Sequence, residues 1–412
     1  MRDNPEILII VRKIDPSAEI RLVNVFKALK SSSYKIIESY RGLSRELVSD
    51  FISAKIIVFQ RTFDPISKEL ADVALQFGKV LVYDIDDDLL SLPLNSLISL
   101  THKDKERIIY FLKQSIYLTT STQRLKEKYI QYNSSVRVIE NTINVSRWHH
   151  QPNRAKDKTR ILLVSIDYFK LTTFKDPFIN LLKSLLKLND VEFYIIGTVP
   201  SADLLMNDNV YSLGFIFPYT AYLEAVEDLR IDIALVPLEE TDFHAHKSVI
   251  KFVEYSALGI AGIYSNVPPY NIDPIKDEIN ALLVDNTREA WEKAIHKLMK
   301  DTGMRKELQD QAYKTVCQHY DLKYATQKWQ ELISKIEDDG ISQMSQEELQ
   351  SLKHRLIKII RYSRVLWVLS YALGGFRLVI RVLRGQISIR NLLSVLKGSQ
   401  TRFTGKNGTV HE

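Results

Sequence analysis

Short apolar runs alternate with longer amphipathic segments along most of the chain, and this alternation constrains the fold more than any other feature. Each run is a nearly continuous stretch of Val, Ile, Leu or Tyr, which is typical of strands buried on both faces of a parallel sheet. In the first half the runs are Ile7–Val11, Lys35–Glu38, Ile56–Phe59, Val80–Tyr83, Tyr117–Thr120 and Val136–Ile139. Strands that alternate with helices predict right-handed βαβ units in a doubly wound α/β sheet.

The polar stretch His149–Thr159 (HHQPNRAKDKT) interrupts this pattern, and a second alternation follows it. Its apolar runs are Ile161–Ser165, Glu192–Ile196, Val210–Ser212, Ile233–Val236, Ile260–Tyr264 and Ala281–Val284. Two successive units of similar length predict two Rossmann-like domains, residues 1–148 and 160–318, that face each other across a cleft, with residues 149–159 as the linker. Ligands of such sheets bind beyond the carboxyl ends of the strands.

The C-terminal part of the chain differs in charge from the rest. A predicted helix over residues 319–337 and a polar linker over residues 338–351 precede a basic tail, residues 352–412. The tail has twelve Lys or Arg residues and a single acidic one, whereas the preceding residues have 44 basic and 49 acidic side chains. A nearly neutral, slightly acidic body therefore carries a strongly basic tail.

Within the tail, basic clusters flank an apolar patch that contains the amphipathic aromatics Trp367 and Tyr371. Gly374 and Gly375 are expected to break or bend the helix. This pattern predicts a pair of interfacial helices over residues 352–397 on an anionic membrane surface. The alternative is a helical hairpin packed on the body or on another subunit. Nucleic acid is not expected as a partner, because the tail lacks a Gly or aromatic readout motif.

Cys317 is the only cysteine, which excludes a disulfide framework and a cysteine-ligated metal cluster and fits a reducing compartment. The N-terminal apolar run, Ile7–Val11, is too short for the core of a signal peptide, and no stretch offers 18 uncharged apolar residues. These observations predict a cytoplasmic protein, which the basic tail would hold on the inner face of the membrane.

The segment richest in candidate binding residues is HAHKSVIKFVEYSALGIAGIYSNVPPY. A helix that starts near His246 or Lys247 would place Lys247 and Lys251 on one face, beside Ser248 and the free amides of the first turn. The N–H groups, the helix dipole and two ammonium groups all favour an anion such as a diphosphate. Glu254, two turns after Lys247, is suited to accept hydrogen bonds from two ribose hydroxyls. The alternative is a helix with solvated lysines and a glutamate that pairs with one of them.

This segment resembles the donor-site signature of glycosyltransferase family 4 and its GT-B relatives, Lys-Phe-x-Glu-Tyr-x-Ala-x-Gly, which stands here from Lys251 to Gly259. The resemblance extends over residues 5–335. It implies the GT-B fold, with a last helix that crosses back to the first domain. In that family the glutamate that matches Glu254 binds the nucleotide ribose. A second glutamate often stands eight residues earlier, where this chain has His246, so contact with the donor sugar is made differently here, or the enzyme is specialised or impaired.

Further candidates come from the same resemblance and from the ends of predicted strands. Lys175 matches the place where relatives have a lysine on the diphosphate, and Gly214 and Phe215 follow a strand end and could place backbone groups on the base. Arg21 lies early in the first helix, next to the place where relatives have a Gly-Gly loop that this chain lacks. Arg61 follows the third strand and is expected to face the cleft. An exposed, solvated side chain is the alternative for each.

Four carboxylates stand together in VLVYDIDDDLL, at the end of the fourth predicted strand. Asp86 and Asp87 lie where relatives often carry a His-Asp pair near the donor sugar, so we expect one of them to act as an acid or base or to contact the sugar. Packed acids raise one another's pKa, which suits a proton acceptor. Structural capping, solvation and a metal-binding Asp-x-Asp are the alternatives. The metal is the least favoured, and Asp88 is expected to point outward.

Together these features predict a glycosyltransferase that moves a sugar from a nucleotide-sugar donor to a hydroxyl of a saccharide or lipid-linked acceptor, in surface polysaccharide synthesis. Retention of stereochemistry is implied by the resemblance, and neither a cofactor nor a metal is expected. Two alternatives remain open. One is a catalytically inactive GT-B-like subunit that serves as a scaffold at the membrane, and the other is a nucleotide-sugar epimerase of the same fold.

Overall fold

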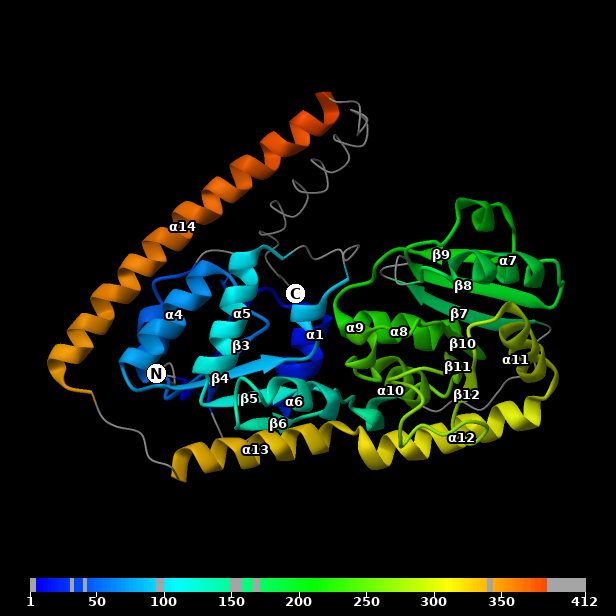
Figure 1. Ribbon diagram of the computed structural model, residues 1–412, viewed down its shortest axis with the longest axis horizontal. Coiled ribbons are helices and arrows are strands. Elements are labelled where there is room, and N and C mark those ends of the chain that lie inside the picture. The colour runs from blue at the N-terminus through cyan, green and yellow to red at the C-terminus, as the bar shows by residue number, and fades with distance from the viewer. Residues whose placement is uncertain are drawn as a thin grey trace, which may run out of the picture.

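Two α/β domains lie side by side in the computed structural model, and one long helix extends away from the first of them (Figure 1). The structure describes residues 5–29, 33–39, 43–93, 100–148, 158–165, 171–338 and 344–383, with side chains as far as Val365 in the last range. Each domain contains a six-stranded sheet, and the strand pairs within both sheets are parallel. The prediction of two Rossmann-like domains is confirmed.

The first sheet has the order β2-β1-β3-β4-β5-β6. Its strands are β1 (Ile7–Val11), β2 (Tyr34–Glu38), β3 (Ile56–Gln60), β4 (Val80–Ile85), β5 (Tyr117–Thr120) and β6 (Val136–Val138). Val58 of β3 pairs with Ile9 of β1 on one side and with Val82 of β4 on the other. The strand order reverses between β1 and β3, and this reversal leaves a crevice at the carboxyl ends of these two strands.

The second sheet has the order β12-β11-β10-β7-β8-β9, which reverses between β7 and β10. Its strands are β7 (Thr159–Ser165), β8 (Val191–Gly197), β9 (Val210–Leu213), β10 (Ile233–Val236), β11 (Ala261–Ser265) and β12 (Leu282–Val284). All twelve strands begin and end within two residues of the predicted apolar runs, because continuous β-branched and aromatic runs of this length have few other stable environments.

Helices cover both faces of each sheet. In the first domain they are α1 (Pro16–Ala18), a π-helical turn η1 (Glu19–Val23), α2 (Asn24–Ala28), α3 (Leu47–Ser53), α4 (Pro65–Gln76), η3 (Leu89–Ser91), α5 (His102–Gln114), α6 (Gln123–Tyr129) and η4 (Val145–Arg147). In the second domain they are α7 (Lys175–Leu185), η6 (Ala202–Met206), α8 (Tyr219–Leu229), α9 (Asp242–Ala245), α10 (Ile250–Ala257), α11 (Arg288–Lys300) and α12 (Thr302–His319). Side-chain caps such as Asp64 of α4 and Thr101 of α5 fix where several of them begin.

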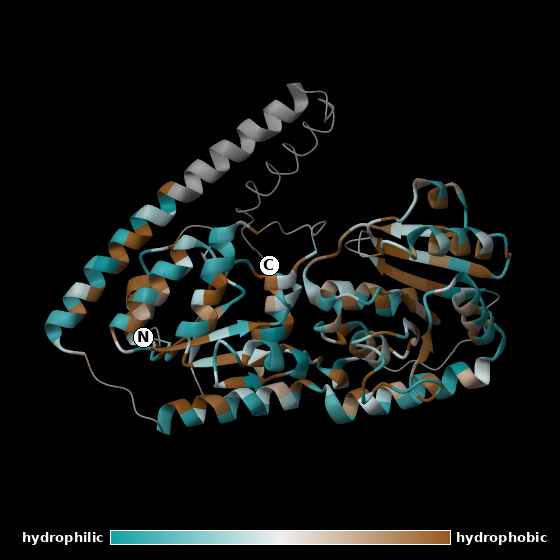
Figure 2. Cartoon of the chain, in the orientation of Figure 1, coloured by the Kyte–Doolittle hydropathy of each residue, from teal (hydrophilic) through white to brown (hydrophobic). Residues whose placement is uncertain are grey.

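Hydrophobic residues concentrate on the strands (Figure 2), and those of the strands and of the helix faces that cover them are buried. Every residue of β1 and β3 is buried, since each strand packs on helices from both sides. Phe59 faces the cluster formed with α4 and α5, and its neighbour Val58 faces the cluster formed with α2 and a later helix. The rigid sheets hold the loops at the strand ends in defined positions.

That later helix is α13 (Leu322–Asp338), which returns from the second domain to the first. α12 and α13 lie end to end along one edge of the molecule, beneath the second and the first domain respectively (Figure 1). Trp329 of α13 is buried and meets Phe26 of α2 edge to face, with ring centroids 5.1 Å apart. The chain therefore links the two domains again after the second one is complete.

The predicted break of the tail at Gly374 and Gly375 is wrong, because one helix, α14 (Gln346–Leu383), runs through both. Its first part packs on α3 and α4. Leu352 and Leu356 are fully buried in the core of the first domain, and the hydroxyl of Ser363 accepts a hydrogen bond from the N–H of Leu43 at 3.1 Å. The beginning of the tail is thus part of the body, as the alternative interpretation foresaw.

The far part of α14 continues beyond the first domain (Figure 1). The side chains of Trp367 and Tyr371, residues 384–412 and most of the linker predicted at 149–159 lie outside the described part of the structure. Among the described helices, none combines the length and the apolar character that crossing a membrane requires.

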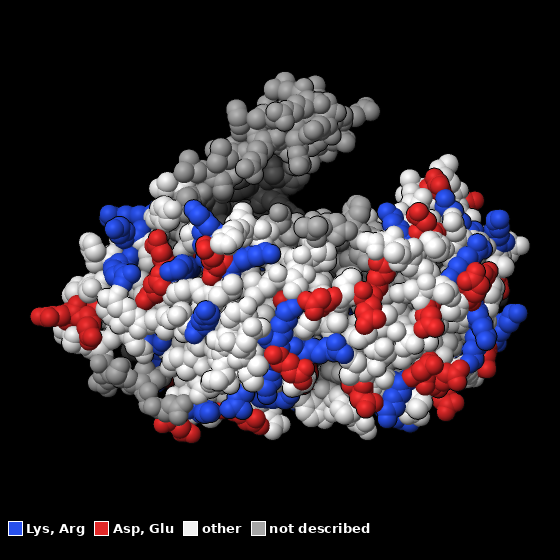
Figure 3. Space-filling model, viewed as in Figure 1, with Lys and Arg blue, Asp and Glu red and all other residues white. Residues whose placement is uncertain are grey.

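On the face of the two domains shown in Figure 3, acidic and basic side chains are interspersed, so this face carries no field of one sign.

Candidate functional site

A cavity of about 350 Å³ lies between the domains, beyond the carboxyl ends of both sheets. The first domain lines it with residues that follow β1, β3 and β4, and the second with the ends of β7, β8 and β10, the loop after β9, the turn before α10 and one side of α10. The predicted site residues that line it are Arg61, Asp86, Asp87, Phe215, Lys247, Ser248, Lys251 and Glu254. Those that do not line it are Arg21, Lys175, Gly214 and His246.

The helix that carries the donor-side residues begins later than the sequence predicted. α10 begins at Ile250, so the predicted start near His246 or Lys247 is wrong. A separate short helix, α9, precedes it; the side chain of Thr241 caps the start of α9, which ends at Ala245. Lys247 and Ser248 therefore lie in the turn between the two helices, next to the N-terminus of α10.

Glu254 lies on α10 in the cavity wall and is only 2% exposed. Its Oε2 accepts a hydrogen bond from Lys251 Nζ at 2.8 Å and another from the Tyr222 hydroxyl at 3.1 Å. The Lys251 ammonium also lies 4.7 Å from the centroid of the Tyr222 ring. The lysine–glutamate pairing that was the alternative interpretation is present, and both side chains line the cavity, where a ligand can reach them.

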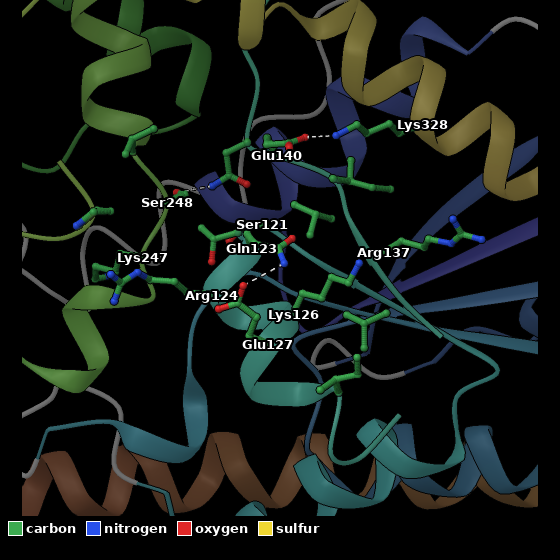
Figure 4. Close-up of a pocket in the computed structure, with 18 of the residues that line it drawn as sticks. Ser121, Gln123, Arg124, Lys126, Glu127, Arg137, Glu140, Lys247, Ser248 and Lys328 are labelled. Atoms are coloured by element: carbon green, nitrogen blue, oxygen red, sulfur yellow. Dashed lines mark hydrogen bonds and ion pairs between the residues drawn. The ribbon is translucent and has the colours of Figure 1, made fainter. Parts of the chain in front are cut away.

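Lys247 pairs with a residue of the opposite domain. Its Nζ lies 3.0 Å from Asp87 Oδ1 and 4.7 Å from the centroid of the Phe243 ring. The neighbouring Ser248 accepts a hydrogen bond at its Oγ from Asn141 Nδ2, which also belongs to the first domain, at 2.8 Å (Figure 4). The turn before α10 is therefore both a wall of the cavity and a contact between the domains.

His246 makes contacts outside the cavity. Its ring Nδ1 lies 2.6 Å from the backbone oxygen of Asp242, one turn earlier. Its own backbone oxygen accepts a hydrogen bond from Thr122 Oγ1 of the first domain at 3.1 Å. His246 thus fixes the turn and the domain contact, and the structure does not bring its ring to the predicted donor site.

The placement of Arg21 corrects its prediction as a cleft contact. Its side chain and that of Asp84 are both fully buried within the first domain. Two nitrogens of the guanidinium donate to the two oxygens of Asp84, at 2.5 and 3.1 Å, and a third donates to Asn141 Oδ1 and to the backbone oxygen of Ile139. Thr119 Oγ1 donates to the same carboxylate at 2.6 Å. Arg21 therefore ties α1–η1 to the sheet, beneath the cavity rather than in it.

Asp86 and Asp87 form the cavity wall of the first domain together with Arg61. Arg61 Nη1 lies 3.3 Å from Asp86 Oδ1, and Nη2 lies 3.7 Å from Asp87 Oδ2. Burial raises the pKa of Asp86, against the opposing effect of Arg61. Arg61 has a left-handed backbone, with φ of 49°, in the tight turn after β3. Such backbone strain in a non-glycine residue is common at functional sites.

Asp88 points inward, so the prediction that it points outward is wrong. It is fully buried, accepts a hydrogen bond from Lys128 Nζ at 2.5 Å and another from the Tyr129 hydroxyl at 3.0 Å. Lys128 also donates to Asp242 of the second domain at 2.7 Å. Ligand atoms of Asp88, Asp242 and His246 lie within 4.8 Å of one another, a spacing that a metal ion could use. The ammonium of Lys128 already supplies a positive charge to both carboxylates there.

The remaining candidates on the second domain are dispersed. Lys175 is the first residue of α7 and does not line the cavity. Gly214 follows β9, and a Cβ atom there would meet nothing within 4 Å. Phe215 lines the cavity and is 59% exposed, so its ring is available to a ligand. Of these three residues, only Phe215 lies in the cavity wall.

Two functional candidates were not predicted. Ser17, on α1, lines the cavity and donates to Asp86 Oδ2 at 2.5 Å, and its only sequence signal was the Asp-Pro start of that helix. Glu239 follows β10 and accepts five hydrogen bonds from the backbone and hydroxyls of Thr172, Thr173 and Phe174. Although burial opposes ionisation, these bonds lower the pKa of Glu239 to about 2. It fixes the loop that enters α7.

A second, larger hollow of about 1370 Å³ adjoins this cavity and is lined by α6, β6, α13 and the turn before α10 (Figure 4). Asn141, Lys247 and Ser248 line both hollows. The hydrogen bond between Asn141 and Ser248 thus forms part of the boundary between them.

No family model matches the chain, and no curated protein matches its sequence. Solved structures do match its fold. A sucrose-phosphate synthase of Thermosynechococcus elongatus aligns over 81% of this chain and 100% of its own, with a TM-score of 0.60 and 12% identity. HepE of Anabaena, in complex with UDP and glucose, aligns over 80% of this chain and 100% of its own, with a TM-score of 0.58 and 14% identity. A glycosyltransferase of Rickettsia africae aligns over 82% of this chain and 100% of its own, with a TM-score of 0.57 and 14% identity. The predicted GT-B fold is confirmed.

Proposed function

We propose that the protein is a glycosyltransferase that moves a sugar from a nucleotide-sugar donor to a hydroxyl group of an acceptor. The observation that carries this proposal is the composition of the interdomain cavity. Lys247, Lys251 and Glu254 line it on the second domain, opposite Asp86 and Asp87 on the first. Cations suited to a diphosphate thus face carboxylates suited to a hydroxyl, across the space where both substrates would meet. A fold alone would not support this assignment.

On the donor side, the diphosphate would lie at the turn before α10. Lys247 supplies positive charge there, and the hydroxyl of Ser248 and the N–H groups at the helix N-terminus supply hydrogen-bond donors. Glu254 would bind the ribose hydroxyls in place of, or together with, its present partners, Lys251 and Tyr222. The exposed ring of Phe215 would contact the base.

On the acceptor side, Asp86 and Asp87 would contact the acceptor hydroxyl or the donor sugar. During transfer the bond between the anomeric carbon and the diphosphate oxygen breaks, and a bond to the acceptor oxygen forms. The hydroxyl proton leaves either to a carboxylate of this pair or to the departing diphosphate, whose charge Lys247 would stabilise. We propose retention of anomeric configuration, as the family resemblance implies, and a reaction in which cations and amides rather than a metal stabilise the leaving group.

Binding of nucleotides tests this proposal directly. Purified protein is screened with UDP, GDP, ADP, CMP and dTDP by thermal unfolding, with Glu254→Ala and, as a matched control, Glu307→Ala from the exposed surface of α12. One nucleotide at a hundred times its Kd should stabilise the wild type and the control by about 2.7 kcal/mol and the Glu254 variant by much less. The absence of stabilisation by all five would contradict the donor site. Hydrolysis of the matching nucleotide-sugar then separates an enzyme from an inactive scaffold.

We also propose that α14 places the enzyme on an anionic membrane surface, at the inner face of the membrane, where a lipid-linked acceptor for surface polysaccharide would be available. The outer face of α14 supports this, since Ile357, Tyr362 and Val365 are exposed there beside Lys358 and Arg361. Apolar side chains flanked by cations suit the boundary between headgroups and acyl chains.

A further inference from the structure

We propose that Asp87 and the donor diphosphate compete for Lys247, so that donor binding releases Asp87 for the acceptor. This inference rests on the proposed donor site and adds the order in which the site is assembled. In the structure the Lys247 ammonium is held by the carboxylate of Asp87 from the opposite domain, 3.0 Å away. The cation that the diphosphate needs is therefore already engaged, by a residue suited to the acceptor hydroxyl.

The pair lies in the cavity that the donor would enter. Both side chains line it, and both are partly exposed to it, Lys247 by 24% and Asp87 by 19%. Ser248, the next residue of the turn, lines the same cavity at the N-terminus of α10. A diphosphate that accepts hydrogen bonds from this turn shares the cavity with Lys247, whose ammonium attracts it.

Simultaneous binding of both anions would leave more negative charge at one ammonium than the two carboxylates leave at Lys128, because a diphosphate carries more than one charge. A carboxylate 3.0 Å from the ammonium and a phosphate oxygen in hydrogen-bond contact with the same nitrogen lie within about 6 Å of each other. Like charges at that separation repel each other in a partly buried site, where water screens them little. The diphosphate carries more charge than the carboxylate and gains the N–H groups of α10 as well, so it displaces Asp87.

Asp87 has a second cation that makes its release possible. Arg61 Nη2 lies 3.7 Å from the other carboxylate oxygen, Oδ2, and the same guanidinium lies 3.3 Å from Asp86. Loss of Lys247 therefore leaves the carboxylate charged and partly compensated rather than buried alone. Its Oδ1 becomes available to accept a hydrogen bond from the acceptor hydroxyl. Lys247 holds this oxygen until the donor has bound. The carboxylate of Asp87 can therefore bind the acceptor only after donor binding.

A double-mutant cycle tests the competition. The variants are Asp87→Asn, Lys247→Met and the two combined, and the probes are UDP and inorganic pyrophosphate, since pyrophosphate does not depend on which base the enzyme prefers. Uridine serves as the probe without phosphate. Asp86→Asn is the matched control, because it removes one carboxylate from the same wall without touching Lys247. Dissociation constants are measured by calorimetry, and circular dichroism verifies that each variant is folded.

Competition predicts that Asp87→Asn binds the phosphate probes about 3- to 10-fold tighter than the wild type, since a partly exposed ion pair no longer has to be broken. Lys247→Met binds them more weakly, and adding Asp87→Asn to Lys247→Met produces no further gain. Uridine binding does not change, and Asp86→Asn gives a smaller gain than Asp87→Asn.

The inference is overturned if Asp87→Asn leaves phosphate binding unchanged or weakens it while the wild type binds the probes. It is also overturned if the gain persists in the Lys247→Met background, because a general reduction of negative charge would then account for it. If neither UDP nor pyrophosphate binds the wild type, the proposed donor site fails, and this inference fails with it. A failure of the competition alone is thus distinguishable from a failure of the proposed function.

Discussion

Arg21 and Asp84 form a fully buried ion pair beneath the interdomain cavity, with two guanidinium nitrogens 2.5 and 3.1 Å from the two carboxylate oxygens. The pair connects α1–η1, which carries Ser17 and Ile20 of the cavity wall, to the end of β4, directly before Asp86. The position of the catalytic candidates therefore depends on an electrostatic contact that no ligand can reach.

We expect Arg21→Met to lower the free energy of unfolding by about 3–5 kcal/mol, because it leaves the charge of Asp84 buried without its ionic partner. The measurement is urea unfolding followed by circular dichroism. Arg124→Met, on the exposed surface of α6, is the matched control and should change stability by less than about 0.5 kcal/mol. A loss below about 1 kcal/mol for Arg21→Met would show that the pair adds little to the fold.

The difference between Arg21 and the strands shows how much of this fold and site the sequence can predict. The strands depend on local composition, and continuous apolar runs such as Ile7–Val11 identify them. The partner of Arg21 lies 63 residues away, and only the register of β3 and β4 brings it there. Sequence alone predicts that a polar residue of a helix is exposed to solvent, unless its buried partner is known.

The same limit applies at the site itself. Asp86 and Asp87 were predicted to act at the site and do line the cavity, whereas Asp88 was predicted to point outward and turns inward to Lys128, 40 residues away. The predicted start of α10 was too early because Lys247 fits the helical spacing of Lys251 and Glu254, although it lies in the turn before the helix. The residues of α10 that line the cavity were identified because their spacing is local.

Leu356 and Ile357 of α14 test whether this helix belongs to the first domain. Leu356 is fully buried against the core, and its neighbour Ile357 is 43% exposed. We expect Leu356→Ala to destabilise the protein by about 2–5 kcal/mol, through lost burial and the cavity that remains. Ile357→Ala should cost less than about 0.5 kcal/mol. Equal effects of the two variants in urea unfolding would show that α14 does not pack as described.

Lys79 makes stability depend on alkaline pH. Its ammonium is buried, donates to the backbone oxygens of Ile52 and Ala54 at 3.1 and 2.6 Å, and has its pKa lowered to about 8 by desolvation. Between about pH 8 and the ordinary lysine pKa, the unfolded chain binds more protons than the folded one, so stability rises with pH. Below pH 8 both states are protonated, and the destabilising effect of the buried charge is constant.

We therefore expect the free energy of unfolding of the wild type to rise relative to that of Lys79→Met by about 1 kcal/mol for each pH unit between pH 8.5 and 10. Between pH 6 and 7.5 the difference between the two proteins should stay constant, since neither state titrates there. Urea unfolding at half-unit pH steps measures both ranges. A difference that is flat up to pH 10, or that falls, would show that Lys79 keeps an ordinary pKa in the folded protein.

Binding to vesicles tests the exposed face of α14. We expect the wild type to sediment with vesicles that contain anionic lipid and much less with neutral vesicles, because each basic side chain near an anionic surface contributes about 1 kcal/mol. A variant with three exposed apolar residues of α14 changed should lose most of this binding; the changes are Ile357→Ser, Tyr362→Ser and Val365→Ser. Because these side chains face away from the core, the variant should unfold at nearly the wild-type urea concentration.

The matched control removes three exposed apolar side chains from elsewhere on the two domains, through Ile130→Ser, Met206→Ser and Ile279→Ser. Vesicle binding should survive in this control, since none of its changes lies on α14. High salt should weaken the wild-type interaction, because the attraction of the basic side chains is screened while the apolar contact remains. If the α14 variant and the control bind anionic vesicles equally well, the outer face of α14 between Ile357 and Val365 is not the membrane contact.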